Sequence, residues 1–288
     1  MSAPRLLVVE GNTAEGRKHH VAAGGQVASE GYARLLRDLW SDAVVDVCFP
    51  ADAGANLPDK AGLEGYDGVA VTGSGLHVYQ GGPAVDAQVQ LVRAVYEAET
   101  PLFGSCWGLQ VATVAAGGSV RRSPRGREIG FGRRIRLNGR GREHPLYTNK
   151  PDVFEALTVH LDEVEALPED AIVLATNDHS DVQAVEIRYN GGVAWGVQYH
   201  PEYPFAEIAT ILRRISASLL VEGFFLDAEE ASRYAADLDA LEKNPFDRRI
   251  AWKHGINGSV THRDQRVLEL KNWIEGLIKP QRSARGRA

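Results

Sequence analysis

The stretch TPLFGSCWGLQVATVAAGG, residues 100–118, decides the fold that we expect for this chain. The apolar run that ends at Ser105 predicts a strand, and the residues after it repeat apolar side chains at helical spacing until two glycines end the pattern. Cys106 therefore lies where a strand turns directly into a helix, with Gly104 and Gly108 two residues away on either side. Such glycines allow a strand and a helix to pack closely around a strained bend, as in the G-x-S-x-G nucleophile elbow.

Strand-like and helix-like segments alternate on the N-terminal side of this stretch. Short apolar runs at 5–11, 43–49 and 66–75 predict strands, and amphipathic patterns at 28–40 and 84–99 predict helices. Strands that alternate with helices predict an α/β fold with a doubly wound, mainly parallel sheet.

The pattern changes after the glycines that end this helix. Five strand-like pieces between residues 119 and 200 lie closer together, and they predict an antiparallel extension of the sheet. From 204–223 onward the chain becomes helical, with a second helix that Asp227 opens with capping-box spacing and a third helix at 261–278. We therefore expect a group of C-terminal helices after the sheet.

Composition argues against several classes of protein. The chain has 288 residues and a formal net charge of -6, which is unsuited to general nucleic-acid binding. No apolar run approaches the roughly 20 residues that span a bilayer, and the first apolar run is too short for a signal peptide. We expect a cytoplasmic protein with no nucleic-acid or membrane partner. Neither Cys48 nor Cys106 has metal-ligand spacing, so we expect no metal site and no disulfide framework.

The predicted position of Cys106 favours a reactive thiol. The N-terminus of the following helix directs backbone N–H groups and a positive dipole end at the sulfur, which lowers the pKa of a thiol and favours the thiolate. Most free cysteines are instead small buried apolar residues, and we expect this of Cys48, which lies inside the run 43–49. For Cys106 this stretch alone leaves both alternatives open.

The stretch WGVQYHPEYP, residues 195–204, offers a base for the thiol. His200 follows a predicted strand, and Glu202 projects to the same side of an extended backbone two residues later. One ring nitrogen could take the thiol proton while the carboxylate holds the other. By itself His-Pro-Glu also fits a capped turn before the next helix, but its pairing with Cys106 at a second strand end favours the base.

Together, Gly104 to Gln110 and His200-Pro201-Glu202 resemble the class I, triad-type glutamine amidotransferase family in motif, order and spacing. The resemblance covers about residues 4–215 and implies a flavodoxin-like glutaminase domain. It also implies that Cys106 is the nucleophile, His200 the general base and acid, and Glu202 the group that orients the histidine. The implied reaction hydrolyses the side-chain amide of glutamine through a γ-glutamyl thioester and needs no cofactor.

Two further segments correspond to parts of the family's active site. The loop 71–82 lies where the family keeps its oxyanion hole, although relatives often carry G-G-P or S-G-P where this chain has T-G-S-G-L-H. The segment 177–186 resembles the one that holds the α-amino and α-carboxylate groups of glutamine, and a glutamine four residues after the nucleophile matches the family. The implied oxyanion donors are the backbone N–H groups near Gly73, Ser74, Gly75 and Trp107, and the implied substrate-binding residues are Gln110, His179, Ser180 and Asp181.

Three functions remain open at this point. The chain has no P-loop and no recognisable synthetase half, so our first expectation is a glutaminase that supplies ammonia to a separate synthetase partner. The alternatives are a stand-alone hydrolase of γ-glutamyl peptides or amides, and a non-catalytic binding or regulatory protein on the same fold. In both enzymatic alternatives the substrate is a small molecule, either glutamine or a γ-glutamyl compound.

We divide the chain into a glutaminase domain of residues 1–215 and a helical C-terminal extension of residues 216–288 with a disordered basic tail. The extension could pack on the sheet, form the face of a homo-oligomer or dock a synthetase. We expect the arginine-rich segment 121–142 to be a solvated surface with local carboxylate partners. The polar segment 10–25 is expected to be a loop at the pocket edge.

Overall fold

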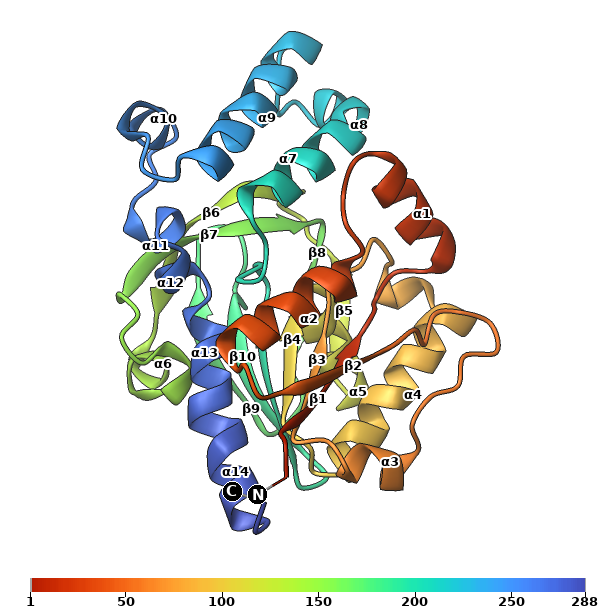
Figure 1. Ribbon diagram of the computed structural model, residues 1–288. Coiled ribbons are helices and arrows are strands. Elements are labelled where there is room, and N and C mark those ends of the chain that lie inside the picture. Colours follow the sequence, from red (N-terminus) through yellow and green to blue (C-terminus); the bar gives the residue numbers. More distant parts are fainter. Residues whose placement is uncertain (1, 288) are drawn as a thin grey trace.

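The computed structural model describes residues 2–287, and a nine-stranded mixed sheet forms its centre (Figure 1). The strand order is β2-β1-β3-β4-β11-β10-β9-β6-β7, in which β2, β1, β3, β4 and β11 are parallel and the remaining strands extend the sheet in antiparallel fashion. This arrangement confirms the predicted α/β class. The strands are β1 Arg5–Val9, β2 Val44–Cys48, β3 Gly68–Val71, β4 Leu102–Ser105, β6 Glu128–Leu137, β7 Val153–His160, β9 Ala171–Thr176, β10 Ala184–Tyr189 and β11 Gly192–Val197, and a separate antiparallel pair consists of β5 Ser119–Arg122 and β8 Asp162–Ala166.

Helices cover both faces of the parallel part of the sheet, which explains why its strands are apolar almost without interruption. In β1, Leu6 and Val8 pack towards one helical layer, whereas Leu7 and Val9 pack towards the other. The first layer contains α2 Ala28–Leu39, α13 Leu268–Trp273 and the π-helical turn η3 Ile274–Ile278, and the second contains α3 Lys60–Glu64, α4 Pro83–Glu97 and α5 Trp107–Ala115.

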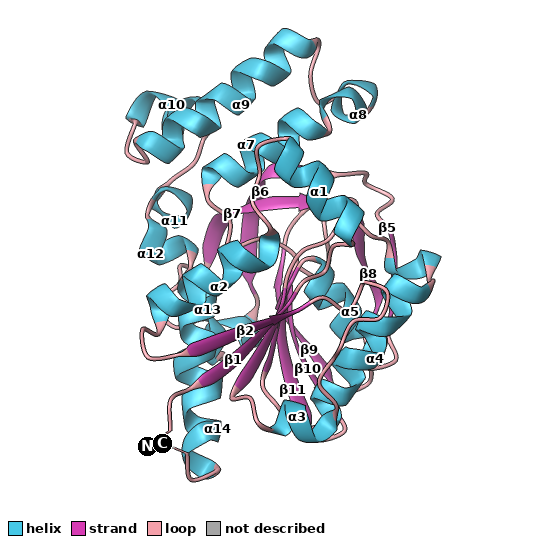
Figure 2. Cartoon of the chain, turned by 45° about the vertical axis from the view of Figure 1, so that its right-hand side comes forward, coloured by secondary structure: helices cyan, strands magenta, loops and turns pink. Residues whose placement is uncertain are grey.

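A third cluster of helices packs on the antiparallel end of the sheet, above β6 and β7 (Figure 2). The sequence predicts one helix at 204–223, but Ile215 leaves helical geometry, with φ -107° and ψ 15°, and divides it into two. The helix predicted at 261–278 is divided in the same way at Val267. The cluster and the short connecting helices are α7 Phe205–Arg214, α8 Ser216–Val221, α9 Ala228–Lys243, α10 Arg248–Lys253, α11 Gly258–Thr261 and α12 Arg263–Arg266, and between β6 and β7 lie α6 Gly139–Glu143 and η2 Pro145–Tyr147.

The described part of the basic C-terminal tail is largely helical, whereas its composition predicts disorder. It forms α14, Lys279–Ala284, and Arg282 in this helix is buried beside Asp67, with 2.8 Å between guanidinium and carboxylate. An arginine-rich composition is typical of solvated segments, but here the buried Asp67, from the other end of the chain, gives Arg282 an acidic partner. The two termini accordingly lie close together (Figure 1). Within residues 2–287, no helix has both the length and the apolar character needed to cross a membrane.

Candidate active site

Cys106 occupies the sharp turn between β4 and α5. Its backbone has a positive φ of 51° and a ψ of -98°, a combination that is rare for a residue with a side chain. A Cβ atom on Gly104 would lie 2.3 Å from the backbone carbon of Gly108, and one on Gly108 would lie 2.5 Å from the carbonyl oxygen of Val71. The flanking glycines are therefore what allows α5 to pack so closely on the ends of β3 and β4.

His200 and Glu202 follow the end of β11, the strand that pairs with β4. His200 Nδ1 lies 2.7 Å from Glu202 Oε1, and the two side chains are only 1% and 3% exposed. The Tyr203 ring stacks on the imidazole with 3.9 Å between centroids. Burial disfavours the charged form of the ring, but the Glu202 carboxylate and the Cys106 sulfur outweigh burial and raise the pKa of His200 to about 10.

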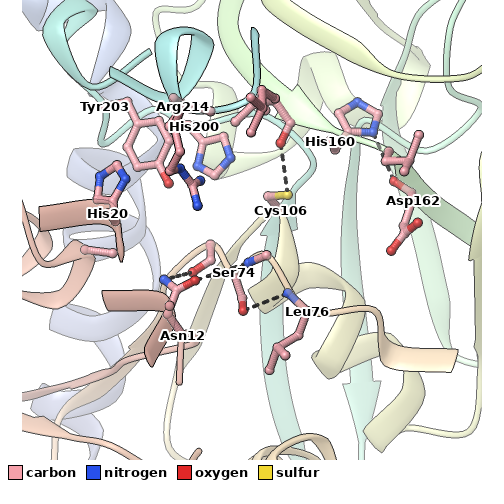
Figure 3. A pocket seen from close by; sticks show the side chains of 18 of the residues that line it. Asn12, His20, Ser74, Leu76, Cys106, His160, Asp162, His200, Tyr203 and Arg214 are labelled. Atoms are coloured by element: carbon pink, nitrogen blue, oxygen red, sulfur yellow. Dashed lines mark hydrogen bonds between the residues drawn. The ribbon is translucent and has the colours of Figure 1, made fainter. Parts of the chain in front are cut away.

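Cys106 and His200 line the same cavity, which has a volume of about 290 Å³ (Figure 3). In this structure Cys106 Sγ donates a long hydrogen bond to the carbonyl oxygen of Val159, at 3.6 Å. His200 Nε2 is buried and has no hydrogen-bond partner in the described part of the chain. A thiol beside a buried ring nitrogen without a partner suits nucleophilic attack with proton transfer between the two groups.

The loop after β3 and the start of α5 carry the predicted oxyanion donors. The backbone N–H of Gly75 is engaged, because it donates to Asn12 Oδ1 at 3.2 Å. Across residues 2–287, no protein acceptor receives a hydrogen bond from the backbone N–H of Gly73, Ser74 or Trp107. Gly73 and Ser74 line the cavity, so they have free donors at its wall, and Trp107 adds one at the start of α5.

The predicted substrate-binding residues His179, Ser180 and Asp181 do not line the cavity, and the Asp181 side chain lies on the surface. This segment instead supports the wall, because the neighbouring Asn177 donates to Glu128 Oε1 at 2.6 Å and Glu128 Oε2 lies 2.8 Å from the ring of His160. Burial would raise the pKa of Glu128, but its hydrogen bonds with His160 and Asn177 keep that pKa below the usual value. The role of His179, Ser180 and Asp181 in substrate binding therefore stays a prediction.

Residues 159–162 form this part of the wall, and the sequence did not single them out. They contain His-Leu-Asp at 160–162, the same His-x-Asp pattern as at 179–181. Both segments lie at the end of a predicted strand, so the pattern does not distinguish them. The backbone N–H of His200 donates to the carbonyl oxygen of Leu157 at 2.8 Å, and this long-range contact brings the end of β7 to the cavity. The carboxylate of Asp162 lies 2.6 Å from His77 Nδ1 and accepts a hydrogen bond from the Tyr79 hydroxyl at 3.1 Å, which ties this hairpin to the loop after β3.

Gln110 does line the cavity, one turn into α5. Its side-chain NH₂ donates to the backbone oxygen of Asp162 at 3.2 Å and to Gln198 Oε1 at 3.4 Å. Its side-chain oxygen accepts no hydrogen bond from the described residues, so it remains available to a ligand.

The segment 10–25 borders the opposite side of the cavity and is helical rather than a loop. It contains α1, Ala14–Ala22, which Thr13 caps by accepting a hydrogen bond from the backbone N–H of Gly16. No residue of α1 is buried, so the sequence has no apolar periodicity that would have predicted the helix. His20 Nε2 lies 2.6 Å from Glu207 Oε1 in α7, and this pair holds α1 beside the cavity.

Most arginines of the segment 121–142 have local acidic partners, as we expected of a surface. These ion pairs are Arg121–Glu163, Arg125–Asp181, Arg127–Glu222, Arg134–Asp178, Arg136–Asp178 and Arg142–Asp152. Only Arg127 of these arginines also lines the cavity.

Comparisons with known proteins identify relatives of this fold and site. The family model of the glutamine amidotransferase class-I domain matches residues 42–213. A γ-glutamyl-L-1-hydroxyisopropylamide hydrolase of a Pseudomonas species is 32% identical over 285 residues, which cover 97% of this chain and 95% of that protein. γ-Glutamyl peptidase 5 of Arabidopsis thaliana is 28% identical over 184 residues, 64% of this chain and 72% of that protein. The crystal structure of a glutamine amidotransferase from Thermotoga maritima matches 97% of this chain and 100% of its own with a TM-score of 0.62 at 20% identity, which confirms the predicted flavodoxin-like fold.

Proposed function

The chain belongs to the glutamine amidotransferase class-I family, and we propose that it is a stand-alone amidohydrolase that cleaves γ-glutamyl amides. The similarity to the Pseudomonas hydrolase carries this proposal, because it extends over 97% of the chain and so includes the C-terminal helices. This favours our alternative over our first expectation, a glutaminase that depends on a synthetase partner. The pocket geometry supports an enzyme, since it combines a strained cysteine, a buried histidine and free backbone donors.

In the proposed reaction, Cys106 Sγ attacks the γ-carbonyl carbon of the substrate. The raised pKa of His200 makes its ring a strong base, so we propose that the proton of Cys106 Sγ passes to His200 Nε2 as the sulfur attacks. The carbonyl oxygen becomes an oxyanion, which the backbone N–H groups of Gly73, Ser74 and Trp107 stabilise. One such donor lowers the activation free energy of related acyl transfers by about 3 to 4 kcal/mol.

The tetrahedral intermediate then collapses to a thioester. The C–N bond breaks, His200 Nε2 gives its proton to the leaving amine, and a γ-glutamyl thioester remains on Cys106. A water molecule next attacks the thioester carbon and transfers a proton to His200, and the sulfur leaves as the thiolate. Glutamate is released, and return of the proton from His200 Nε2 to Cys106 Sγ completes the cycle. Glu202 holds Nδ1 throughout, so that Nε2 stays directed at the reacting atoms.

Glutamate release by the purified chain tests this proposal. We expect release from γ-glutamyl amides such as γ-glutamyl-L-alaninol without any partner protein, and loss of release in Cys106→Ala. Slow release from L-glutamine together with inert γ-glutamyl amides would favour the partner-dependent glutaminase. Turnover that survives Cys106→Ala would refute the proposed nucleophile.

The partner-dependent glutaminase remains the second candidate, because the family as a whole takes its name from amide transfer. It differs from the first proposal in one measurable property. A partner would raise glutamine hydrolysis, whereas a stand-alone hydrolase reaches its full rate alone.

A further inference from the structure

The cavity has two flanks, and the role of His200 as general acid indicates which of them receives the leaving group. Figure 3 shows Cys106 between His160 and Asp162 on one side and His20, Tyr203 and Arg214 on the other, with His200 above it. In the proposed reaction, His200 protonates the leaving nitrogen. His200 and the Tyr203 ring stacked on it lie on the same side of Cys106 as Arg214 (Figure 3), and we assign the leaving amine to this flank. The γ-glutamyl group then occupies the flank of Gln110 and Asp162.

The leaving-group flank contains a guanidinium without an acidic partner. Two arginines line the cavity, and Arg127 is neutralised by a bidentate pair with Glu222, with both N···O distances at 2.9 Å. Arg214, at the C-terminal end of α7, makes no ion pair and no side-chain hydrogen bond with any of residues 2–287. Its side chain extends into the cavity beside Tyr203 (Figure 3). Its immediate neighbour Arg213 instead pairs with Asp239 on the surface.

No acidic group among the described residues forms an ion pair with Arg214. The nearest acid on the same helix is Glu207, but its carboxylate lies 2.6 Å from the ring of His20 and is only 8% exposed. The Tyr203 hydroxyl donates no hydrogen bond to the described residues, so it is a second free donor on this flank. A planar guanidinium and a phenol that both lack partners form a site for a carboxylate.

We infer that the preferred leaving group carries a carboxylate bound by Arg214, so that the substrates are γ-glutamyl amino acids or γ-glutamyl peptides. The inference rests on the proposed γ-glutamyl hydrolase activity and specifies its substrate class. It distinguishes this chain from a hydrolase that acts only on the amide of an uncharged amino alcohol. Arg214 here is a specificity-determining residue that acts through its contact with the leaving group.

Three substrates of one carbon skeleton test this inference. γ-Glutamyl-L-alanine has a carboxylate on the leaving group, γ-glutamyl-L-alaninol has a neutral hydroxymethyl group at the same place, and the γ-glutamyl amide of 1,2-diaminopropane has an ammonium. We expect the wild-type chain to prefer the alanine compound. Arg214→Gln should lower kcat/KM for γ-glutamyl-L-alanine roughly 10-fold and leave kcat/KM for γ-glutamyl-L-alaninol unchanged. This loss is at the lower end of the range for a charge-assisted hydrogen bond, because Arg214 is solvent-exposed. Arg214→Glu should reverse the preference towards the ammonium compound.

Arg213→Gln is the matched control, since it removes the neighbouring arginine outside the cavity and should change none of the three rates. An equal loss for the alanine and alaninol compounds in Arg214→Gln would overturn the inference, because Arg214 would then bind the α-carboxylate of the γ-glutamyl group. Equal rates for wild type and Arg214→Gln on all three compounds would overturn it as well. If wild type hydrolyses none of the compounds, the proposed function itself fails, so the two failures are distinguishable.

Discussion

Replacing Gly73 by alanine should damage catalysis without unfolding the protein. A Cβ atom at this position would lie 2.7 Å from Cε1 of His200 and 3.1 Å from the Tyr203 hydroxyl, whereas ordinary contacts begin near 3.4 Å. The ring would have to withdraw by about 0.7 Å. It is held by the stack with Tyr203 and by the 2.7 Å contact with Glu202, so a shift of this size disturbs the pairing with Cys106.

The size of the loss follows from this displacement. A misplacement of about 1 Å in a reacting group costs on the order of 100-fold in rate. We therefore expect Gly73→Ala to lower kcat/KM by roughly 30- to 100-fold, which is about 2 to 3 kcal/mol in the activation free energy. The loop has little freedom to move instead of the ring, because the carbonyl oxygen of Gly73 accepts hydrogen bonds from Thr72 at 3.0 Å and from Asn12 at 3.3 Å.

Steady-state hydrolysis of a chromogenic γ-glutamyl anilide measures this effect, and alkylation of Cys106 by iodoacetamide reports on the thiol independently of any substrate. Both rates should fall in Gly73→Ala, while the Tm changes by only a few degrees. Gly139→Ala is the control for the substitution itself, because a Cβ atom there meets nothing within 4 Å. If Gly73→Ala keeps kcat/KM within threefold of wild type, the described position of His200 against this loop is not the one used in catalysis.

Two further changes test the charges beneath the site. Glu202→Gln removes the main cause of the raised pKa of His200, so the alkaline limb of kcat/KM should move from about pH 10 towards neutrality in a pH–rate profile. The folded-state pKa of His200 lies above the unfolded value of about 6.5, so the wild-type pair stabilises the fold fully below that pH and loses this contribution as the pH rises through about 10. Glu202→Gln should reduce this pH dependence of the free energy of unfolding in urea titrations. Lys150→Met should lower the free energy of unfolding by about 3 to 5 kcal/mol, because it strands the completely buried Glu269 carboxylate, 2.9 Å from the ammonium in wild type. The double variant Lys150→Met/Glu269→Leu should recover most of that loss, and a single-variant cost below about 1 kcal/mol would contradict the buried pair.

The local parts of the site could be predicted from the sequence because each depends on neighbouring residues only. The bend at Cys106 needs Gly104 and Gly108 within two positions, because a Cβ atom at either would lie only 2.3 or 2.5 Å from backbone atoms. His200 and Glu202 are two residues apart, so strand geometry alone predicts that their side chains meet. The proximity of Cys106 and His200 is long-range, and only the family's motif order made it predictable.

The parts that could not be predicted depend on contacts between distant segments. Nothing in the sequence of α1 marks it as helical, because none of its residues is buried. The two His-x-Asp segments at 160–162 and 179–181 are equivalent as patterns, and a long-range hydrogen bond from the His200 N–H to the carbonyl oxygen of Leu157 in β7 brings the first to the cavity. The helical tail depends on Arg282 and Asp67, which are 215 residues apart.

The C-terminal helices contact the strand end that carries His200. Tyr199, the residue before His200, donates a hydrogen bond from its hydroxyl to Glu269 of α13 at 2.7 Å. Glu269 also binds Lys150, so a buried charge pair lies next to the residue that precedes His200. Burying two charges costs several kcal/mol unless their geometry is well fixed, so this network requires α13 in one position.

The same helices also contact the strand that carries the cysteine. Trp273 is completely buried and lies 5.7 Å, between ring centroids, from Phe103, three residues before Cys106. Residues 268–278 therefore cover the apolar face of β4 as they fix the end of β11. An extension that served only to dock a partner would need neither contact, whereas an enzyme that works alone needs its nucleophile and base held rigidly from behind. We therefore propose that residues after 215 are a structural part of the catalytic unit, which agrees with a hydrolase relative that is similar along 95% of its own length.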